Sequence, residues 1–150
     1  MTEKKYQKKI FIFTDGGSRG NPGPAALGVA IQDENENLIK EYGEFLGKKT
    51  NNEAEYEAVI FALKKTKHLF GKKKIKEIEV TIKTDSELLA RQLNGEYKIE
   101  NANLQLLFMK IWNLKIDFGA VNFQHVAREK NKRADRLANE ILDKKTLPLF

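Results

Sequence analysis

A short apolar run that ends in an acidic turn constrains the fold of this chain more than any other feature. Residues 10–13 are Ile-Phe-Ile-Phe, and Thr14, Asp15, Gly16 and Gly17 follow directly. A continuous apolar run stopped by turn residues is typical of a strand buried on both faces. We therefore expect Asp15 at the carboxyl end of a buried strand.

Two further strands are predicted close behind the first. Residues 25–32 and 38–46 have strand character around a polar turn, and we expect them to form a meander with the first strand. Residues 16–24 hold four of the ten glycines and two of the three prolines, which predicts an irregular loop before the meander.

The remainder of the chain alternates helices with strands. Thr50 begins a capping box, and apolar residues then recur at helical spacing over residues 51–70. Residues 78–83 alternate as a strand does and lead to Asp85 and Ser86, where Ser86 is suited to cap a short helix. We expect a helix over 101–115, a strand over 121–125 and a last helix over 131–143. Strand–helix–strand crossovers make parallel neighbours, so the order predicts an α/β fold.

Composition narrows the possible partners and metals. A chain of 150 residues is typical of one domain, and the absence of cysteine excludes disulfides and thiolate sites, which leaves oxygen ligands and two histidines for a hard cation such as Mg²⁺. Lys and Arg outnumber Asp and Glu by 27 to 21, which favours an anionic partner such as nucleic acid. Lysine runs at 4–9, 64–76 and 144–145 are, by themselves, more typical of solvated faces. With no run of signal-peptide or membrane-spanning length in the sequence, we expect a soluble cytoplasmic protein.

Two aspartates are expected at one edge of the sheet. In open α/β sheets the site lies beyond the carboxyl ends of parallel strands, so Asp15 and Asp85 meet if their strands are neighbours. Taken singly, Asp15 before two glycines fits an ordinary turn equally well. Together, two strand-end aspartates invite a cation.

Two helices offer further carboxylates. Glu53, Glu55 and Glu57 all suit the start of a helix, but Glu55 shares the face that points nearest the core. Asp135 lies beside the apolar stripe of the last helix, where an isolated aspartate would form a surface ion pair. Four carboxylates brought close together would need cations, and two Mg²⁺ ions about 3.5–4 Å apart are the usual solution.

Four segments in this order resemble the motifs of the type 1 ribonuclease H family. They are residues 14–25 (TDGGSRGNPGPA), 50–55 (TNNEAE), 84–86 (TDS) and 125–139 (HVAREKNKRADRLAN). The resemblance implies a ribonuclease H-like fold over residues 1–145, with a five-stranded mixed sheet in the order 3-2-1-4-5 and helices on both faces.

The resemblance also implies an activity. A member of this family is an endoribonuclease that hydrolyses the RNA strand of RNA–DNA hybrids by two-metal-ion catalysis and leaves 5′-phosphate and 3′-hydroxyl ends. It implies Asp15, Glu55, Asp85 and Asp135 as ligands of two Mg²⁺ ions, with Mn²⁺ as a substitute, in a protein expected to be a monomer.

The same resemblance implies residues that bind the substrate. The loop after the first aspartate and the paired asparagines read 2′-hydroxyls of the RNA strand. A pocket for a DNA phosphate falls to Thr50 and Asn101. The expected substrate-binding residues are Gly16, Gly17, Ser18, Asn21, Thr50, Asn51, Asn52, Ser86 and Asn101.

The chain departs from many family members in two places. Residues 93–103 lack the basic, tryptophan-bearing protrusion, so substrate grip is expected elsewhere, for example at residues 72–76. His125 stands ten residues before Asp135, where many members have a histidine that helps product release. The pattern His-Val-x-Arg-Glu resembles a subgroup in which the arginine, here Arg128, does that work, and a purely structural His125 is an equal alternative.

The tail and the activity each leave an alternative open. Residues 146–150 (TLPLF) either pack across the domain or, through Leu147 to Phe150, resemble the short peptides that bind the sliding clamp. Another nuclease or strand-transfer enzyme on the same scaffold is a competing function, although Asn51 and Asn52 argue against it. A non-catalytic hybrid-binding module is another, although the four carboxylates argue against it.

Overall fold

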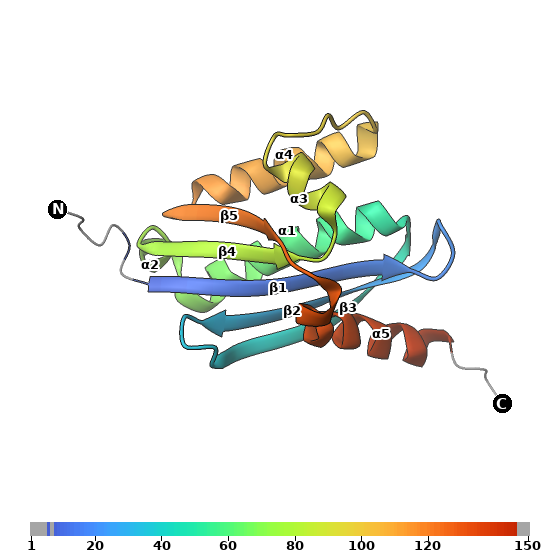
Figure 1. Cartoon of the computed structure of the whole chain (residues 1–150), viewed down its shortest axis with the longest axis horizontal. Coiled ribbons are helices and arrows are strands. Elements are labelled where there is room, and N and C mark those ends of the chain that lie inside the picture. Colours follow the sequence, from blue (N-terminus) through green and yellow to red (C-terminus); the bar gives the residue numbers. More distant parts are fainter. Residues whose placement is uncertain (1–5, 7, 147–150) are drawn as a thin grey trace.

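The chain folds around one five-stranded mixed sheet with helices on both faces. The structure is a computed structural model that describes residue 6 and residues 8–146. The strands lie in the order β3-β2-β1-β4-β5, which confirms the order expected from the sequence (Figure 1). The strands are β1 (Lys8–Ser18), β2 (Gly23–Asp33), β3 (Leu38–Lys49), β4 (Ile78–Thr84) and β5 (Ala120–His125). The first three strands pair antiparallel, and β4 joins both β1 and β5 in parallel.

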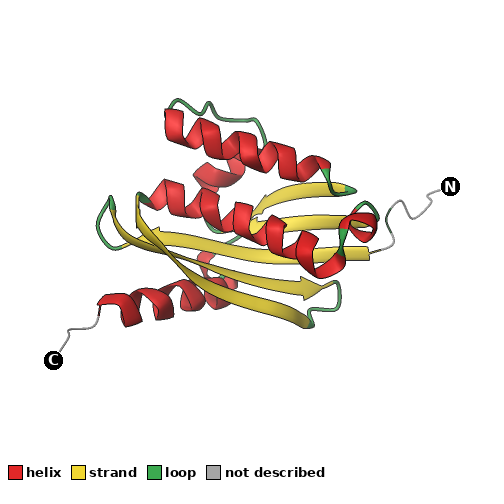
Figure 2. Ribbon diagram, turned by 180° about the vertical axis from the view of Figure 1, so that it is seen from behind, coloured by secondary structure: helices red, strands yellow, loops and turns green. Residues whose placement is uncertain are grey.

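The helices divide between the two faces of the sheet. Figure 2 shows α1 and α4 lying over one face, with α5 on the opposite face. The helical segments are α1 (Asn51–Phe70), α2 (Lys72–Ile75), α3 (Glu87–Leu93), α4 (Ala102–Ile116), the 3₁₀ turn η1 (Arg128–Lys130) and α5 (Lys132–Thr146). Both α2 and η1 were unforeseen, because segments this short have no apolar period to detect. Among the described residues, no helix combines the length and the hydropathy that a membrane span requires.

The doubly buried strand is β2, and the expectation that β1 is covered on both faces was wrong. Ile10 and Ile12 of β1 are fully buried beneath α1, but Phe11 and Phe13 on the other face are only half-buried. The Lys83 ammonium lies 4.8 Å and 5.3 Å from the centres of their rings. Helix α5 packs over the carboxyl end of β1 and over β2 and β3. The rest of that face of β1 is not covered by α5, and there the Lys83 side chain lies over the two phenylalanine rings.

The first loop is shorter than the sequence predicted. Residues 16–24 were expected to be irregular, yet the β1–β2 ladder continues to the pair Ser18 and Ala25, which leaves only residues 19–22 between the strands. Asp15 therefore lies inside β1 rather than at its end. The parallel ladder with β4, in contrast, stops at the pair Thr14 and Thr84. Asp15 is thus the first residue of β1 beyond its parallel neighbour.

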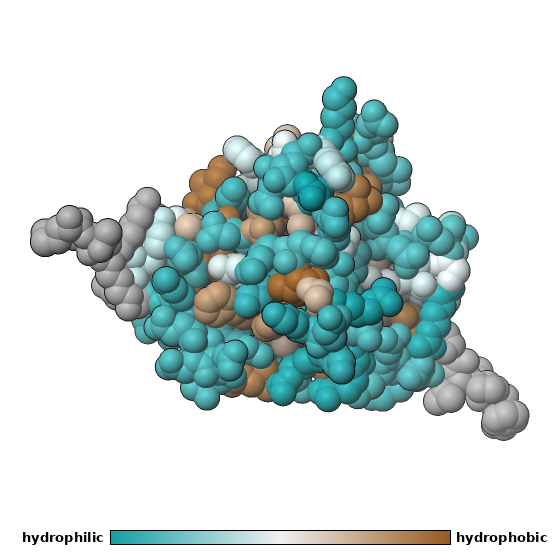
Figure 3. Space-filling view, in the orientation of Figure 1, coloured by the Kyte–Doolittle hydropathy of each residue, from teal (hydrophilic) through white to brown (hydrophobic). Residues whose placement is uncertain are grey.

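The surface seen in Figure 3 is mostly polar. Figure 3 shows hydrophilic residues over most of one face, interrupted by small hydrophobic patches. The last helix was expected to end at residue 143, but α5 continues to Thr146. Residues 147–150, which carry the expected clamp-binding peptide, lie outside the described residues.

Candidate active site

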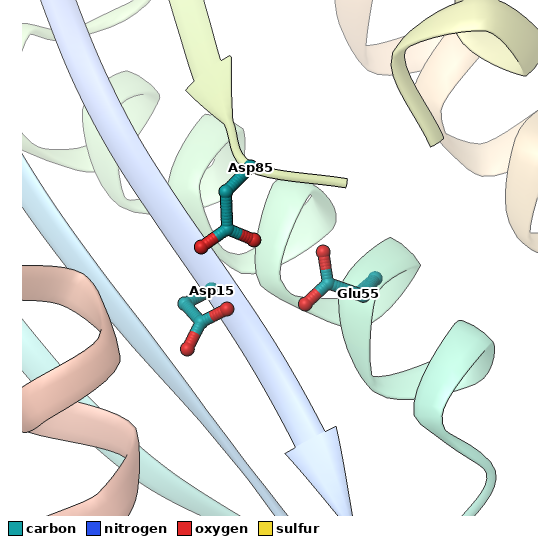
Figure 4. A group of neighbouring side chains, drawn as sticks. All are labelled: Asp15, Glu55 and Asp85. Carbon is teal, nitrogen blue, oxygen red and sulfur yellow. The ribbon is translucent and has the colours of Figure 1, made fainter. Parts of the chain in front are cut away.

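The parallel ladder between β1 and β4 sets two aspartates side by side. Its last pair is Thr14 and Thr84, and the next residue of each chain segment is Asp15 and Asp85. Both carboxylates therefore emerge at the same level of the sheet, as the strand-end rule predicts. Figure 4 shows them facing one another across the gap that opens beyond β4.

The third carboxylate comes from α1. Glu55 is 9% exposed, and the Gly16 amide donates to its Oε1 at 2.7 Å. The Thr84 hydroxyl donates to Oε2 at 3.4 Å. These two donors belong to β1 and β4, so each strand that carries an aspartate also orients the glutamate. Figure 4 shows the Glu55 side chain directed from α1 toward the two aspartates.

Two glycines let the helices approach the sheet closely. A Cβ atom on Gly16 would stand 2.2 Å from the Ala54 carbonyl oxygen, on the α1 side. On the α5 side, a Cβ atom on Gly28 would stand 2.0 Å from the Ala134 carbonyl oxygen. Gly28 is the cross-strand partner of Asp15, so the two helices meet β1 and β2 at the level of the carboxylates. Gly28 was not among the residues predicted from the sequence, although a glycine within an apolar strand is a recognised sign of close backbone approach.

Asp135 stands at the rim of this group. Oxygen atoms of Asp15, Glu55 and Asp85 all lie within 4.8 Å of one another, and Asp135 is not part of that set. It is exposed in the first turn of α5, yet it lines the same hollow of about 360 Å³. Three of the four expected carboxylates are thus brought together closely, with the fourth alongside them.

Asn131 ties the two sides of the hollow together. This residue is 1% exposed, and its Nδ2 donates to the Thr14 carbonyl oxygen at 2.9 Å. Its own carbonyl oxygen accepts from the Asp135 amide at 3.1 Å. The contact fixes the start of α5 against the residue that precedes Asp15. The sequence showed Asn131 as the first residue of a helix but gave no sign of this role.

Burial and crowding raise the pKa values of Asp15 and Glu55. Burial, with added repulsion from Glu55 and Asp85, raises the pKa of Asp15 from 3.8 to about 9. Burial also raises the pKa of Glu55 to about 7, with a further contribution from Asp85, and the Gly16 amide opposes this shift. The salt bridges of the described residues all involve other carboxylates. No salt bridge between described residues therefore offsets the crowding of Asp15, Glu55 and Asp85.

This donor set suits hard divalent cations. Such ions prefer carboxylate oxygens, and the three acidic side chains each offer an oxygen within reach of one common point. A bound cation would also remove the repulsion that raises the pKa values of Asp15 and Glu55. Asp15, Glu55 and Asp85 are the residues that would hold it, and Asp135 would complete the set from α5.

Comparisons with known proteins identify the family to which the chain belongs. A family profile described as "Reverse transcriptase-like" matches residues 13–141. LC11-RNase H1, isolated from compost by a metagenomic approach and solved in complex with an RNA/DNA hybrid, superposes with a TM-score of 0.88 at 46% identity, covering 92% of this chain and 99% of that one. The chain belongs to the type 1 ribonuclease H family.

Curated relatives extend beyond the matched region. The chain is 38% identical to "Ribonuclease HI" of Halobacterium salinarum over 135 residues, which are 90% of this chain and 65% of the relative. It is 35% identical to a bifunctional protein of Mycobacterium tuberculosis over 136 residues, which are 90% of this chain and 36% of that protein. The chain thus spans about two thirds of the length of the first ribonuclease H relative and about a third of the length of the second.

Three of the expected substrate-binding residues form one hydrogen-bonded cluster beside the carboxylates. The amide and the hydroxyl of Ser18 donate to the Asn51 Oδ1 at 2.9 Å and 3.1 Å, and the Asn51 amide donates to the Asn21 Oδ1 at 2.9 Å. Ser18 and Asn51 line the hollow together with Gly16 and Gly17. The ribonuclease H motif after the first aspartate is therefore joined to the start of α1.

Of the other expected substrate-binding residues, three cap helices and one lies outside the carboxylate hollow. Thr50 caps α1, Ser86 caps α3 and Asn101 caps α4, each by accepting an amide hydrogen bond. Ser86 lines the carboxylate hollow, while Thr50 and Asn101 do not. Asn52 is exposed next to Asn51 and is not among the residues that line the hollow.

Arg128 and His125 fall on different sides of the site. Arg128, in η1, lines the carboxylate hollow. His125, the last residue of β5, lines a separate hollow of about 200 Å³ beside Glu87 and Arg91. The two residues expected to compete for one role in this ribonuclease H-family site therefore do not share an environment.

No helix stands where many ribonuclease H proteins carry the basic protrusion. All residues from 94 to 101 are described, and they connect α3 to α4 by turns and extended chain alone. The chain is thus a short form of the family, as the sequence predicted. Arg19 and Asn139 also line the carboxylate hollow, and neither was predicted from the sequence.

Proposed function

We propose that this protein is an endoribonuclease that hydrolyses the RNA strand of RNA–DNA hybrids. The single observation that carries the proposal is the convergence of Asp15, Glu55 and Asp85, from two strands and a helix, on one point within 4.8 Å. The solved relative LC11-RNase H1, which is 46% identical, binds an RNA/DNA hybrid in its crystal structure.

The chain's own residues supply position and charge for this chemistry. Two Mg²⁺ ions, with Mn²⁺ as a substitute, would supply the activation of water and the stabilisation of the leaving 3′ oxygen, which gives 5′-phosphate and 3′-hydroxyl products. Asp15 and Asp85 would face the substrate side by side. The Gly16 amide on β1 and the Thr84 hydroxyl on β4 hold Glu55, and Asp135 lines the same hollow from α5. Arg128 lines the same hollow and is placed to attract a phosphate.

Recognition of RNA is assigned to the cluster beside the carboxylates. Ser18, Asn21 and Asn51 hold one another by hydrogen bonds, so their remaining polar groups are fixed before substrate arrives. Gly16 and Gly17 lie between this cluster and Asp15. The missing side chain of Gly16 admits α1, and that of Gly17 leaves the backbone open to a sugar. A 2′-hydroxyl, which DNA lacks, is the group these donors and acceptors suit.

A cleavage assay tests the proposal. The protein is incubated with labelled RNA–DNA hybrid, RNA duplex and DNA duplex, each with Mg²⁺ or with EDTA. We expect cleavage of the RNA strand of the hybrid alone, and none in EDTA. Cleavage of DNA would instead support a nuclease or strand-transfer enzyme on this scaffold. Hybrid binding without cleavage would support a non-catalytic module.

Four narrower features remain predictions. They are the use of Mg²⁺ by two ions, a cytoplasmic location, a monomeric state, and binding of a sliding clamp by Leu147 to Phe150. Sedimentation measures the monomer directly. Deletion of residues 147–150 tests the clamp, and unchanged affinity for a clamp after deletion would refute that interaction.

A further inference from the structure

A lysine-rich region lies at the opposite end of the sheet from the carboxylates. Helix α2 precedes β4, whereas Asp85 follows it (Figure 1). The seven residue steps from Ile78 to Asp85 span about 23 Å at a rise of about 3.3 Å per residue. This distance separates residues 72–76 from the carboxylates. The expectation that they grip the substrate stays a prediction, and at this distance they would contact it away from the carboxylates.

Two hollows flank α2. The first has a volume of about 390 Å³ and the second about 370 Å³. The residues that line the first are Lys67, Lys72, Lys73, Ile75, Lys76 and Asp117, and those that line the second are Lys8, Phe70, Lys74, Glu77 and Ile78. Six lysines therefore face two carboxylates across the pair of hollows.

Most of this positive charge is uncompensated within the described residues. Lys67 donates to Asp117 at 2.8 Å, which neutralises one lysine in the first hollow. Lys72, Lys73 and Lys76 are exposed and take part in none of the salt bridges between described residues. Three exposed ammonium groups around one concave surface favour a ligand that carries several negative charges.

The floor of the hollows is apolar and includes an aromatic ring. Ile75 and Ile78 are 1% and 2% exposed. Phe70 is half-buried at the end of α1, and the Lys8 ammonium lies 4.9 Å from the centre of its ring. A basic groove combined with an aromatic side chain is the arrangement by which proteins hold single-stranded nucleic acids, because phosphates meet the cations and a base stacks on the ring.

We propose that the two hollows beside α2 bind a single strand of nucleic acid, with its phosphates on Lys72, Lys73 and Lys76 and a base on Phe70. This site is separate from the carboxylates. Since a hybrid commonly continues into unpaired strand, occupation of both sites would hold the protein where a hybrid ends. The chain's net charge of +6 favours such a polyanion in general, and the ring favours one that carries bases.

Binding of a labelled 20-nucleotide single strand in EDTA tests the site directly. The triple variant Lys72→Gln, Lys73→Gln, Lys76→Gln is compared with Lys40→Gln, Lys65→Gln, Lys110→Gln, which removes equal charge from other faces. We expect the first triple to lower affinity about tenfold at moderate salt, and to reduce the slope of log affinity against log salt by about 2. Equal losses in the two triples, or no loss in either, would overturn the proposal.

A second variant tests the stacking contact. Phe70→Leu keeps an apolar side chain that packs against the core but removes the aromatic face. We expect a loss of about fivefold or more in affinity for the single strand, with an unchanged unfolding temperature. Unchanged affinity would refute the role of Phe70. Tight binding of phosphatidylserine vesicles without binding of the strand would refute the nucleic-acid assignment as a whole.

Cleavage measurements separate this inference from the proposed function. On a blunt 12-base-pair hybrid the lysine triple should keep the kcat and KM of the unchanged protein. On a hybrid with a 20-nucleotide single-stranded tail, the unchanged protein should show a lower KM and the triple should lose that gain. If no hybrid is cleaved, the proposed function fails, yet the binding comparison still decides the lysine site.

Discussion

The two ends of β4 carry opposite charges that are held in opposite ways. At its carboxyl end, Asp85 meets Asp15 and Glu55 in a hollow where the side chains are half-buried or buried, and the Gly16 amide and the Thr84 hydroxyl hold Glu55 in place. At its amino end, Lys72 and Lys73 project from a four-residue helix into solvent.

This difference in burial determines how each end can bind a ligand. Carboxylates held close together repel one another, so a bound cation stabilises that end of the sheet. Exposed lysines retain their freedom and share a ligand among several equivalent charges. We therefore expect substitutions at the carboxylates to act nearly all or none, and those at the lysines to act in graded steps.

The largest effect should follow Asp85→Asn. The change keeps the shape of the side chain but removes a charge from the three-carboxylate group, so we expect the rate of hybrid cleavage to fall about 1,000-fold or more, equivalent to about 4 kcal/mol. Glu79→Gln on the same strand is the control, because Glu79 does not line the hollow. Full activity of the Asp85→Asn protein would break the contrast between the two ends.

Next in size is Gly28→Ala. Its Cβ atom would stand 2.0 Å from the Ala134 carbonyl oxygen, so α5 must move away from β2 and take Asp135 with it. We expect unfolding free energy to fall by about 3 kcal/mol, or roughly 6–12 °C in Tm. Gly17→Ala is the matched control, since its nearest contact would be an ordinary 3.9 Å. Equal stability of the two variants, measured by thermal unfolding, would contradict this account.

Arg128 and His125 give a smaller contrast within the active-site end. Arg128 lines the carboxylate hollow and His125 does not. We expect Arg128→Ala to lower steady-state turnover about 10- to 100-fold, and His125→Ala to lower it less. The reverse ranking would assign the helper role to the histidine.

The smallest effect concerns stability without metal. Because the pKa of Asp15 is raised to about 9, the folded state holds a proton that the unfolded state releases, so stability falls as pH rises from about 4 toward 9. Asp15→Asn removes this cost. In EDTA at pH 8 we expect a gain of about 1–3 kcal/mol, or roughly 2–12 °C in Tm, which disappears near pH 4.

Asp33→Asn is the control for that measurement. The Asn37 amide lowers the pKa of Asp33, so stabilisation of this carboxylate is present above its unfolded pKa and is lost as pH falls through its folded pKa. The variant should therefore not gain stability at pH 8. An increase in Tm for both variants would show that general charge reduction, rather than crowding at Asp15, is responsible.

The sequence was sufficient for the five strands, the longer helices and the nearness of two carboxylates. The helix over residues 51–70 agrees in both bounds with α1, because a capping box and an apolar period are local signals. The sequence also predicted that Asp15 and Asp85 lie side by side, because each was expected at the carboxyl end of a strand. In the structure β1 continues to Ser18 through its ladder with β2. Which strands are covered on both faces did not follow, because that depends on where α5 lies.

Most helices and strands and the candidate acidic residues followed from the sequence, because period and turn chemistry depend on neighbouring residues. The strand order followed only from the resemblance of four motifs to the ribonuclease H family. Only the tertiary structure decided that Glu55 is held by Gly16 and Thr84, that Asn131 joins β1 to α5, and that the lysines lie at the far end of β4. These facts rest on contacts between segments far apart in the chain, and on close approaches that a missing Cβ atom permits but does not require.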